Sequence, residues 1–283
     1  MSIASIQSKY PSAIWYDSNH SGGTNSGTLD NPYTSLDTAM TNASSGGVIA
    51  ILDGTHTEDT TIAIPKDLVL VGESLLAVLN TTGSAMYGGG LQGGGFDVTL
   101  ETLTLEHTVG PLTVINPGAG GNLTIDSCKV KYGPSVLNYT NQWGLIGGAQ
   151  GVNLTIQNST LEIGARNYAI LMGGHSNTGN NFSNITITGN TFIIITGSTV
   201  TNISKQTGFT SSVWKNNIFV GQVGTEVLNF TPGTYSNNCF DNTGLTSGGT
   251  DNLFATDPIF VDSASGDYRL RPDSPCLGAG TAS

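Results

Sequence analysis

Short apolar runs alternate with polar residues along most of this chain. The clearest examples are NLTIDSCKV at 122–130, NLTIQNSTL at 153–161 and NITITGNTF at 184–192, and each copy starts 31 residues after the one before. Alternation with a period of two predicts β-strands that bury one face. A constant period of this size predicts a solenoid, in which each coil packs only against its neighbours.

Equivalent apolar positions can be followed from coil to coil after residue 97. Two such columns predict stacks of inward-facing side chains along the solenoid. A third column, which contains several asparagines, predicts an internal ladder of hydrogen-bonded side chains at a corner. The columns are Leu100, Ile125, Ile156, Ile187, Trp214 and Tyr235; Leu105, Val130, Leu161, Phe192, Phe219 and Phe240; and Cys128, Ser159, Asn190, Asn217 and Asn238.

The first coils are predicted at 48–72, where VIAIL, TIAI and LVLVG are separated by turn residues. Just before them Tyr33, Leu36 and Met40 have helical spacing, and Thr34 is a candidate N-cap. A short amphipathic helix here would cover the open end of the solenoid. Residues 1–16 lack a clear pattern, and we expect an arm or an edge-covering strand.

Both ends of the chain carry motifs of a known type. The matching residues are Asp17, Asn19, Pro32, Tyr33, Leu36, Ala39, Gly47, Ile49, Ile51, Gly54, Thr55 and His56 near the start, and Asp257, Pro258, Phe260, Asp262, Gly266, Asp267, Tyr268, Leu270, Ser274, Pro275 and Gly280 near the end. Through these residues the chain resembles the pectate-lyase-like superfamily of right-handed parallel β-helices. The resemblance implies an all-β fold with a single right-handed parallel β-helix, an N-terminal helical cap and a C-terminal cap. We divide the chain into an arm (1–16) and a β-helix (17–283), the latter comprising a cap (17–47), coils (48–250) and a C-terminal cap (251–283).

The charge and amino-acid composition limit the kinds of molecule that this protein is expected to bind. The formal charge is −11 and only 10% of the residues are charged, so nucleic acid and anionic membrane surfaces are not expected partners. No apolar run is long enough to span a membrane, and the N-terminus has no visible secretory leader. The cysteines, Cys128, Cys239 and Cys276, are odd in number and lack a CxxC spacing, so neither a zinc site nor a disulfide framework is predicted.

The superfamily contains lyases, which need a base and a cation, and hydrolases, which use paired carboxylates. This chain has no adjacent aspartate pair and no R-x-K sequence. Glu101 and Asp126 align on neighbouring coils and are the best pair for Ca²⁺, but Gln157 and Thr188 follow them in the column, and Ca²⁺ prefers about six to eight oxygens. We therefore interpret the two acids as solvated surface groups and predict no metal site. Lys131 and Glu162 also align, which predicts a surface ion pair.

The best candidate site lies in the long loops. Trp143, His175 and Lys205 follow successive NLTI or NITI segments at nearly the same distance, so in-register coils would place them along one edge. With Tyr139, Arg166 and Tyr168 nearby, aromatic and polar groups could bind a sugar chain. Trp143, Tyr139, Tyr168 and His175 are the candidate glycan-binding residues, whereas ordinary loop packing remains the alternative.

An extracellular type of fold without a visible leader suggests a virion-surface protein, because phage proteins leave the cell by lysis. We expect a capsid decoration or a tail or spike component without a cofactor, which presents a rigid β-helix to host glycans and contacts other virion proteins through residues 1–16. The alternative is a secreted, extracellular polysaccharide lyase acting on a uronate polymer by β-elimination. It would use His175, Lys205 or Arg166 as the base, with Ca²⁺ as a candidate cofactor. A third candidate is a purely structural or adhesive module.

Overall fold

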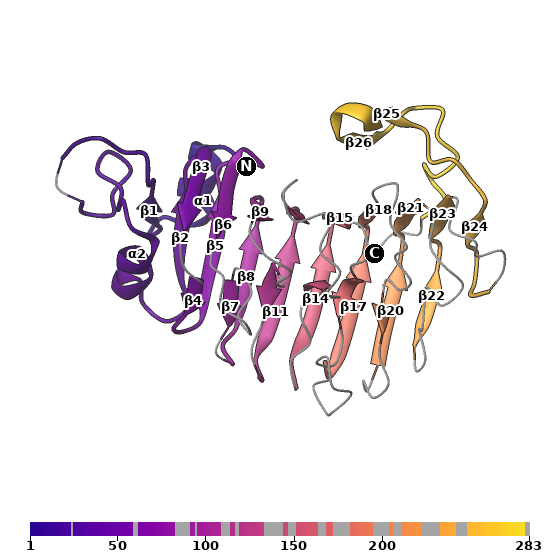
Figure 1. The fold of residues 1–283 in the computed structure, drawn as a ribbon, viewed down its shortest axis with the longest axis horizontal. Helices are drawn as coiled ribbons and strands as arrows, with labels where there is room; N and C mark the ends of the chain where they lie inside the picture. The colour runs from indigo at the N-terminus through magenta and orange to yellow at the C-terminus, as the bar shows by residue number, and fades with distance from the viewer. Residues whose placement is uncertain are drawn as a thin grey trace.

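The chain winds through three parallel sheets in a repeating order, and each strand pairs with its equivalent on the next coil. Figure 1 shows these coils stacked along one axis, with helix α2 (Leu36–Asn42) at one end and strand β24 (Leu253–Phe254) at the other. The expected all-β parallel β-helix is confirmed. The computed structural model describes residues 1–23, 25–58, 62–82, 91–93, 95–108, 114–116, 119–132, 144–146, 151–163, 168–171, 182–194, 204–205, 211–221, 233–241 and 248–280.

Two of the sheets have nine strands each within the described residues. At about 4.8 Å per strand, each of these sheets is roughly 40 Å long. Sheet A contains β1 (Ile14–Tyr16), β2 (Gly47–Ile51), β5 (Leu68–Gly72), β8 (Val98–Glu101), β11 (Asn122–Asp126), β14 (Asn153–Gln157), β17 (Asn184–Thr188), β20 (Ser211–Lys215) and β22 (Thr234–Ser236). Sheet B contains β3 (Gly54–Glu58), β6 (Ala77–Thr81), β9 (Thr104–His107), β12 (Lys129–Tyr132), β15 (Thr160–Ile163), β18 (Thr191–Ile194), β21 (Ile218–Val220), β23 (Cys239–Asp241) and β24.

The third sheet, sheet C, is shorter, and its strands lie in the part of each coil where loop lengths vary. Its described strands are β4 (Ile62–Ile64), β7 (Leu91–Gly93), β10 (Ile115–Asn116), β13 (Gly144–Ile146), β16 (Tyr168–Leu171) and β19 (Ser204–Lys205).

The two apolar columns stack as predicted. Every expected partner in both columns is paired in register along sheets A and B. The Phe192 and Phe219 rings stack with centroids 4.8 Å apart, and Phe219 and Phe240 stack at 4.9 Å. Phe254 extends the row with a centroid 5.4 Å from that of Phe240. This continuous aromatic row runs through the interior of the C-terminal coils.

The predicted internal ladder is also confirmed. The Oδ1 of Asn190 accepts a bond from Ser159 N at 2.9 Å, and the Oδ1 of Asn217 accepts from Asn190 N at 3.0 Å. Asn238 repeats the contact with Asn217 N at 2.9 Å, and Asn252, which the sequence did not single out, repeats it with Asn238 N at 2.8 Å. Each buried amide therefore satisfies the backbone of the coil before it.

A left-handed residue precedes most ladder positions and turns the chain from sheet A into sheet B. Its φ is positive, a conformation that asparagine and glycine adopt more readily than most residues. This explains why polar turn residues recur at the corner between two apolar strands. The residues are Thr102, Ser127, Asn158, Gly189, Asn216 and Asn237.

Helix α2 caps the N-terminal end, as the sequence predicts. Leu36, Ala39 and Met40 are buried in the core. The N-cap is Ser35, whose hydroxyl accepts from Thr38 N at 3.3 Å, so the prediction of Thr34 was wrong by one residue. Among the described residues, no helix is long and apolar enough to cross a membrane.

Residues 1–16 fold against sheet A. Strand β1 pairs with β2 and covers its edge. Helix α1 (Ile3–Lys9), which the sequence pattern did not reveal, brings Ile6 against Trp15, Ala50 and Val71, and these residues form an apolar cluster separate from the main core. The N-terminal segment is therefore a folded cover on the outside of the first coils.

The C-terminal residues turn back along the solenoid. Strands β25 (Phe260–Asp262) and β26 (Asp267–Leu270) are antiparallel, joined by the 3-10 turn η2 (Ser263–Ser265), and lie above sheet B near β15 and β18 (Figure 1). This return brings Cys276 to Cys239, and the two form a disulfide. The prediction of no disulfide was wrong, because cysteine number and spacing do not reveal which segments return to each other. Cys128 is buried and free.

Candidate functional site

The loop constellation falls largely outside the described residues. Trp143, Tyr139, Arg166 and His175 all lie there, so their grouping remains a prediction. Tyr168 and Lys205 belong to strands β16 and β19 of sheet C.

The register of sheet C shows that equal spacing along the sequence, from which the loop constellation was predicted, does not correspond to equal positions in the coils. Lys205 pairs with Leu171, four residues before His175, and Gly144 pairs with Tyr168. Residues 133–143 separate β12 from β13, whereas only 164–167 separate β15 from β16. The loops differ in length on both sides of sheet C. Residues at equal sequence separations from Asn122, Asn153 and Asn184 therefore do not occupy equivalent positions in their coils.

Glu101 is not the solvated acid that the sequence suggested. It pairs with Asp126 in the expected register, but it is only 7% exposed. Its carboxylate accepts from Lys9 Nζ at 2.6 Å and from the Tyr10 hydroxyl at 2.7 Å. The hydrogen bond to Glu101 raises the pKa of Lys9, while burial followed by the same carboxylate raises that of Tyr10. Lys9, the last residue of α1, and the adjacent Tyr10 therefore supply the bonding partners of the Glu101 carboxylate.

Asp126, the other calcium candidate, is occupied by neutral donors. Its oxygens accept from Gln157 Nε2 at 2.8 Å, Ser127 Oγ at 2.9 Å and Asn158 Nδ2 at 3.2 Å. Within the described part of the chain, no group of three or more His, Cys, Asp or Glu residues could hold a metal ion. Both carboxylates of the candidate calcium pair are therefore already bonded to groups of the protein.

Charged residues on the outside of sheet B are also paired. Lys131 and Glu162 are neighbours in register, but each forms its ion pair with another residue: Glu162 with Lys129, which lies diagonally from it, and Lys131 with Glu106, its register partner on β9. Lys129 Nζ lies 2.5 Å from Glu162 Oε1, and Lys131 Nζ lies 3.3 Å from Glu106 Oε2. The predicted partner was therefore wrong, although the residues do form surface ion pairs. Such pairs contribute about 0–1 kcal/mol each.

His56 lies close to Ser18 and Asp17, but the three residues do not form a catalytic triad. Its Nδ1 faces Ser18 N at 3.2 Å and Ser18 Oγ at 3.0 Å, and Asp17 lies 3.8 Å from the same nitrogen. The other ring nitrogen donates to Leu52 O at 2.8 Å, and the ring is fully buried. Because both nitrogens hold backbone groups, His56 fixes the N-terminal turn.

An ordered polar row lies on the outer face of sheet A, and sequence reasoning did not single it out. Asn122 Nδ2 donates to Asp97 at 2.7 Å, Asn153 Nδ2 donates to Asn122 at 2.9 Å, and Asn184 Nδ2 donates to Asn153 at 2.7 Å. The Ser211 hydroxyl donates to Asn184 at 2.8 Å. We call these five residues the outer ladder. In the sequence, the outer ladder is visible as the asparagine that begins each NLTI or NITI segment.

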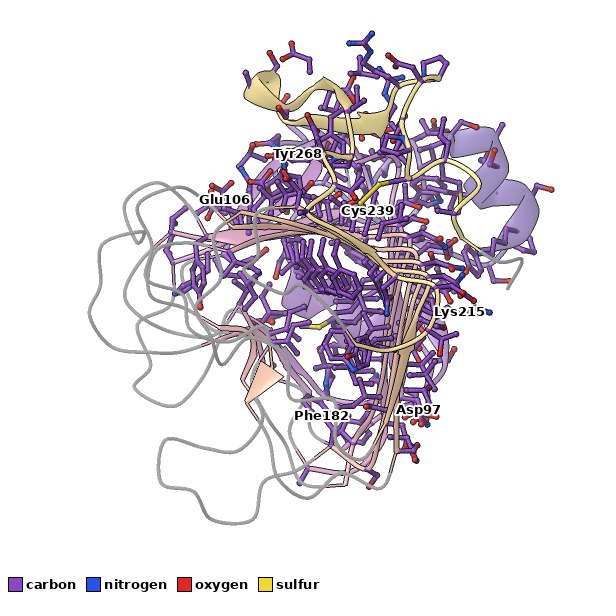
Figure 2. All side chains as sticks on the ribbon, turned by 90° about the vertical axis from the view of Figure 1, so that its right-hand side faces the viewer. Asp97, Glu106, Phe182, Lys215, Cys239 and Tyr268 are labelled. Atoms are coloured by element: carbon purple, nitrogen blue, oxygen red, sulfur yellow. A yellow bond between two sulfur atoms is a disulfide. The ribbon has the colours of Figure 1, made fainter. Side chains whose placement is uncertain are left out.

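A column of threonines runs beside the outer ladder, two residues further along each strand. Thr99, Thr124, Thr155 and Thr186 pair in register, and the buried residues on either side of each show that they face outward. Figure 2 shows Asp97 on the outer side of sheet A, away from the stacked side chains of the interior.

The outer ladder and the threonine column form an array of amides and hydroxyls at coil spacing, about 4.8 Å. The ladder bonds fix the amide orientations, and β-branching restricts the threonine rotamers. Such an array offers both donors and acceptors along the solenoid axis. It can hydrogen-bond a ligand that carries regularly spaced hydroxyl groups.

Comparisons with known proteins reveal similarity in fold but not in sequence. No protein-family model and no curated protein matches the sequence. Among solved structures, a pectin methylesterase from Aspergillus niger aligns with a TM-score of 0.55 at 11% identity, covering 87% of this chain and 86% of that one. A pectin methylesterase from Erwinia chrysanthemi aligns with a TM-score of 0.48 at 13% identity, covering 93% and 98%. At this identity the likeness concerns the fold alone: the chain has a parallel β-helix similar to that of a pectin methylesterase.

Proposed function

We propose that this protein is a rigid, non-enzymatic display protein that binds a polysaccharide along the outer face of sheet A. The observation that carries the proposal is the outer ladder with its threonine column. Both run parallel to the axis over successive coils, as an extended sugar chain would. Preformed polar groups lower the entropic cost of binding, because they are already ordered in the free protein.

Four carboxylates on the outside of the solenoid are already bonded, so they are not free to hold the Ca²⁺ that a lyase would use. Glu101, Asp126, Glu106 and Glu162 all bond to cations or amides. The alternative function, a secreted lyase for uronate polymers, depends on His175, Lys205 or Arg166 as the base. No specific contact in the described residues favours it.

Binding can be tested by titrating the protein with a panel of soluble polysaccharides in a calorimeter. Thr155→Arg places a bulky side chain in the centre of the proposed surface. Thr57→Arg is the matched control, because Thr57 is an exposed threonine on strand β3 of sheet B. We expect only Thr155→Arg to weaken binding, by about tenfold or more. Equal affinities of the two variants would contradict the proposed surface.

The lyase alternative has its own readout, which is the ultraviolet absorbance of the unsaturated product. We expect no absorbance rise on alginate or polygalacturonate, with or without Ca²⁺. A rise that Lys205→Ala abolishes would replace our proposal with the enzymatic one.

We further propose that the display takes place on a virion surface, where a rigid face with regularly spaced polar groups could contact host glycans. Genes for capsid or tail proteins beside this gene would support that setting. Neighbouring genes for secretion or polysaccharide use would favour the secreted alternative.

A further inference from the structure

The C-terminal segment 257–280, which we call the strap, is attached to the solenoid by a covalent bond. Cys276 in the strap is joined to Cys239 of strand β23, with Cα atoms 6.3 Å apart. Cys239 is buried, whereas Cys276 is partly exposed. A reductant can therefore reach the bond from the strap side.

The strap covers part of the outer face of sheet B. The Tyr268 ring centroid lies 6.0 Å from Lys129 Nζ, and Figure 2 shows Tyr268 outside sheet B. The Lys129 side chain keeps 24% of its exposure and that of its partner Glu162 keeps 16%. The strap therefore lies over this ion pair.

Two individual side-chain contacts join the strap to the solenoid, and each of them is weak. They are the Lys129–Tyr268 contact and a hydrogen bond from Asn237 Nδ2 to Ala279 O at 3.2 Å. The ion pairs of the strap are internal: Arg269 pairs with Asp267, and Arg271 with Asp273. Val261 and Leu277 are 48% and 50% exposed, so the strap adds little apolar burial through them.

We propose that the strap is a redox-controlled cover, closed over Lys129 and Glu162 when Cys239 and Cys276 are oxidised and released when they are reduced. Closing is thiol–disulfide exchange with a disulfide-carrying oxidoreductase: the thiols of Cys239 and Cys276 give two electrons and two protons to its disulfide, which becomes a dithiol. Opening is thiol–disulfide exchange with a dithiol, which becomes the new disulfide.

The third cysteine does not compete in this exchange. Cys128 is buried, and burial raises its pKa to about 12, so the nucleophilic thiolate is scarce at neutral pH. Exchange with Cys128 therefore does not compete with the disulfide between Cys239 and Cys276. Disulfides persist outside the cell and are reduced in the cytosol, so the strap opens in the cytosol and closes after release.

Amine labelling of the full-length protein tests this proposal, because strand β12 carries a matched pair of lysines. Lys129 lies under Tyr268, whereas Lys131 pairs with Glu106 and has a similar side-chain exposure of 28%. On reduction with dithiothreitol, the labelling rate of Lys129 should rise roughly threefold or more, and that of Lys131 should stay constant. Mass spectrometry of peptides measures both rates in one sample.

Two variants complete the experiment. Cys276→Ser should label like the reduced protein without any reductant, and Cys128→Ser should label like the oxidised wild type. The proposal is overturned if Lys129 labels at the same rate in both redox states, or if the air-oxidised protein contains no disulfide. Should Cys276→Ser fail to fold, reduction of the wild type, with circular dichroism to confirm the native sheet, decides the matter.

Discussion

Replacing Asn217 by alanine removes one member of the internal ladder and tests what the ladder contributes. The Asn217 side chain accepts from Asn190 N at 3.0 Å and from Asn190 Nδ2 at 3.1 Å. It donates to Ile187 O at 2.9 Å and to Asn238 Oδ1 at 3.0 Å. The residue is only 1% exposed.

The expected loss follows from the backbone groups that lose a partner. Alanine leaves the N–H of Asn190 and the carbonyl of Ile187 without this amide, and each buried unsatisfied group costs about 1–3 kcal/mol. We expect the free energy of unfolding to fall by about 3–5 kcal/mol. That is a large part of the roughly 5–15 kcal/mol that stabilises a typical domain.

The matched control is Asn153→Ala in the outer ladder. Asn153 also accepts one side-chain bond and donates another, but it lies on the surface, where water replaces both. We expect its loss to stay below about 1 kcal/mol. Equilibrium urea unfolding under oxidising conditions measures both variants. If Asn217→Ala costs no more than Asn153→Ala, the buried amides of the internal ladder do not stabilise the corner.

Three further predictions follow from individual contacts. Cys276→Ser removes a disulfide that closes a loop with a sequence separation of 37, and it should lower the free energy of unfolding by about 4 kcal/mol relative to the oxidised wild type, as should reduction of the wild type. Phe219→Ala removes the central ring between Phe192 and Phe240 and should cost about 3–5 kcal/mol in urea unfolding, whereas Phe219→Leu should cost less. The raised pKa values of Lys9 and Tyr10 mean that the folded state holds their protons more tightly, so the contribution of α1 is fully present below pH 10 and is lost as the pH rises through the folded pKa values. Trp15 fluorescence should shift to the red above about pH 10 in the wild type, and the Lys9→Ala variant should shift at lower pH, whereas identical profiles would contradict this role for the Lys9–Glu101 pair.

The repeating interior could be predicted from the sequence because the interactions that make it are periodic. In a parallel solenoid each strand contacts the equivalent strand of the next coil, so an apolar column in an alignment becomes a stack in space. The positions of Ile125, Ile156 and Ile187, the phenylalanine row and the internal asparagines all follow from this rule. The outer ladder was visible in the same repeats, but composition alone does not distinguish an ordered surface row from ordinary polar residues.

The candidate site was less predictable because its residues lie in loops. Two coils of equal length can distribute their residues differently between two loops, and this places Lys205 opposite Leu171. Strand alternation carries no information about loop length on either side of a strand. Trp143 and His175 lie outside the described residues, and their role remains a prediction.

The sequence by itself determined the solenoid, its register in sheets A and B, its helical cap and its internal ladder, because each depends on a local pattern repeated at a fixed interval. Only the tertiary structure decided where the two ends of the chain lie. Helix α1 covers Glu101, and the strap returns to join Cys276 to Cys239. These contacts join segments far apart in the chain and occur once each, so no repeat in the sequence could reveal them.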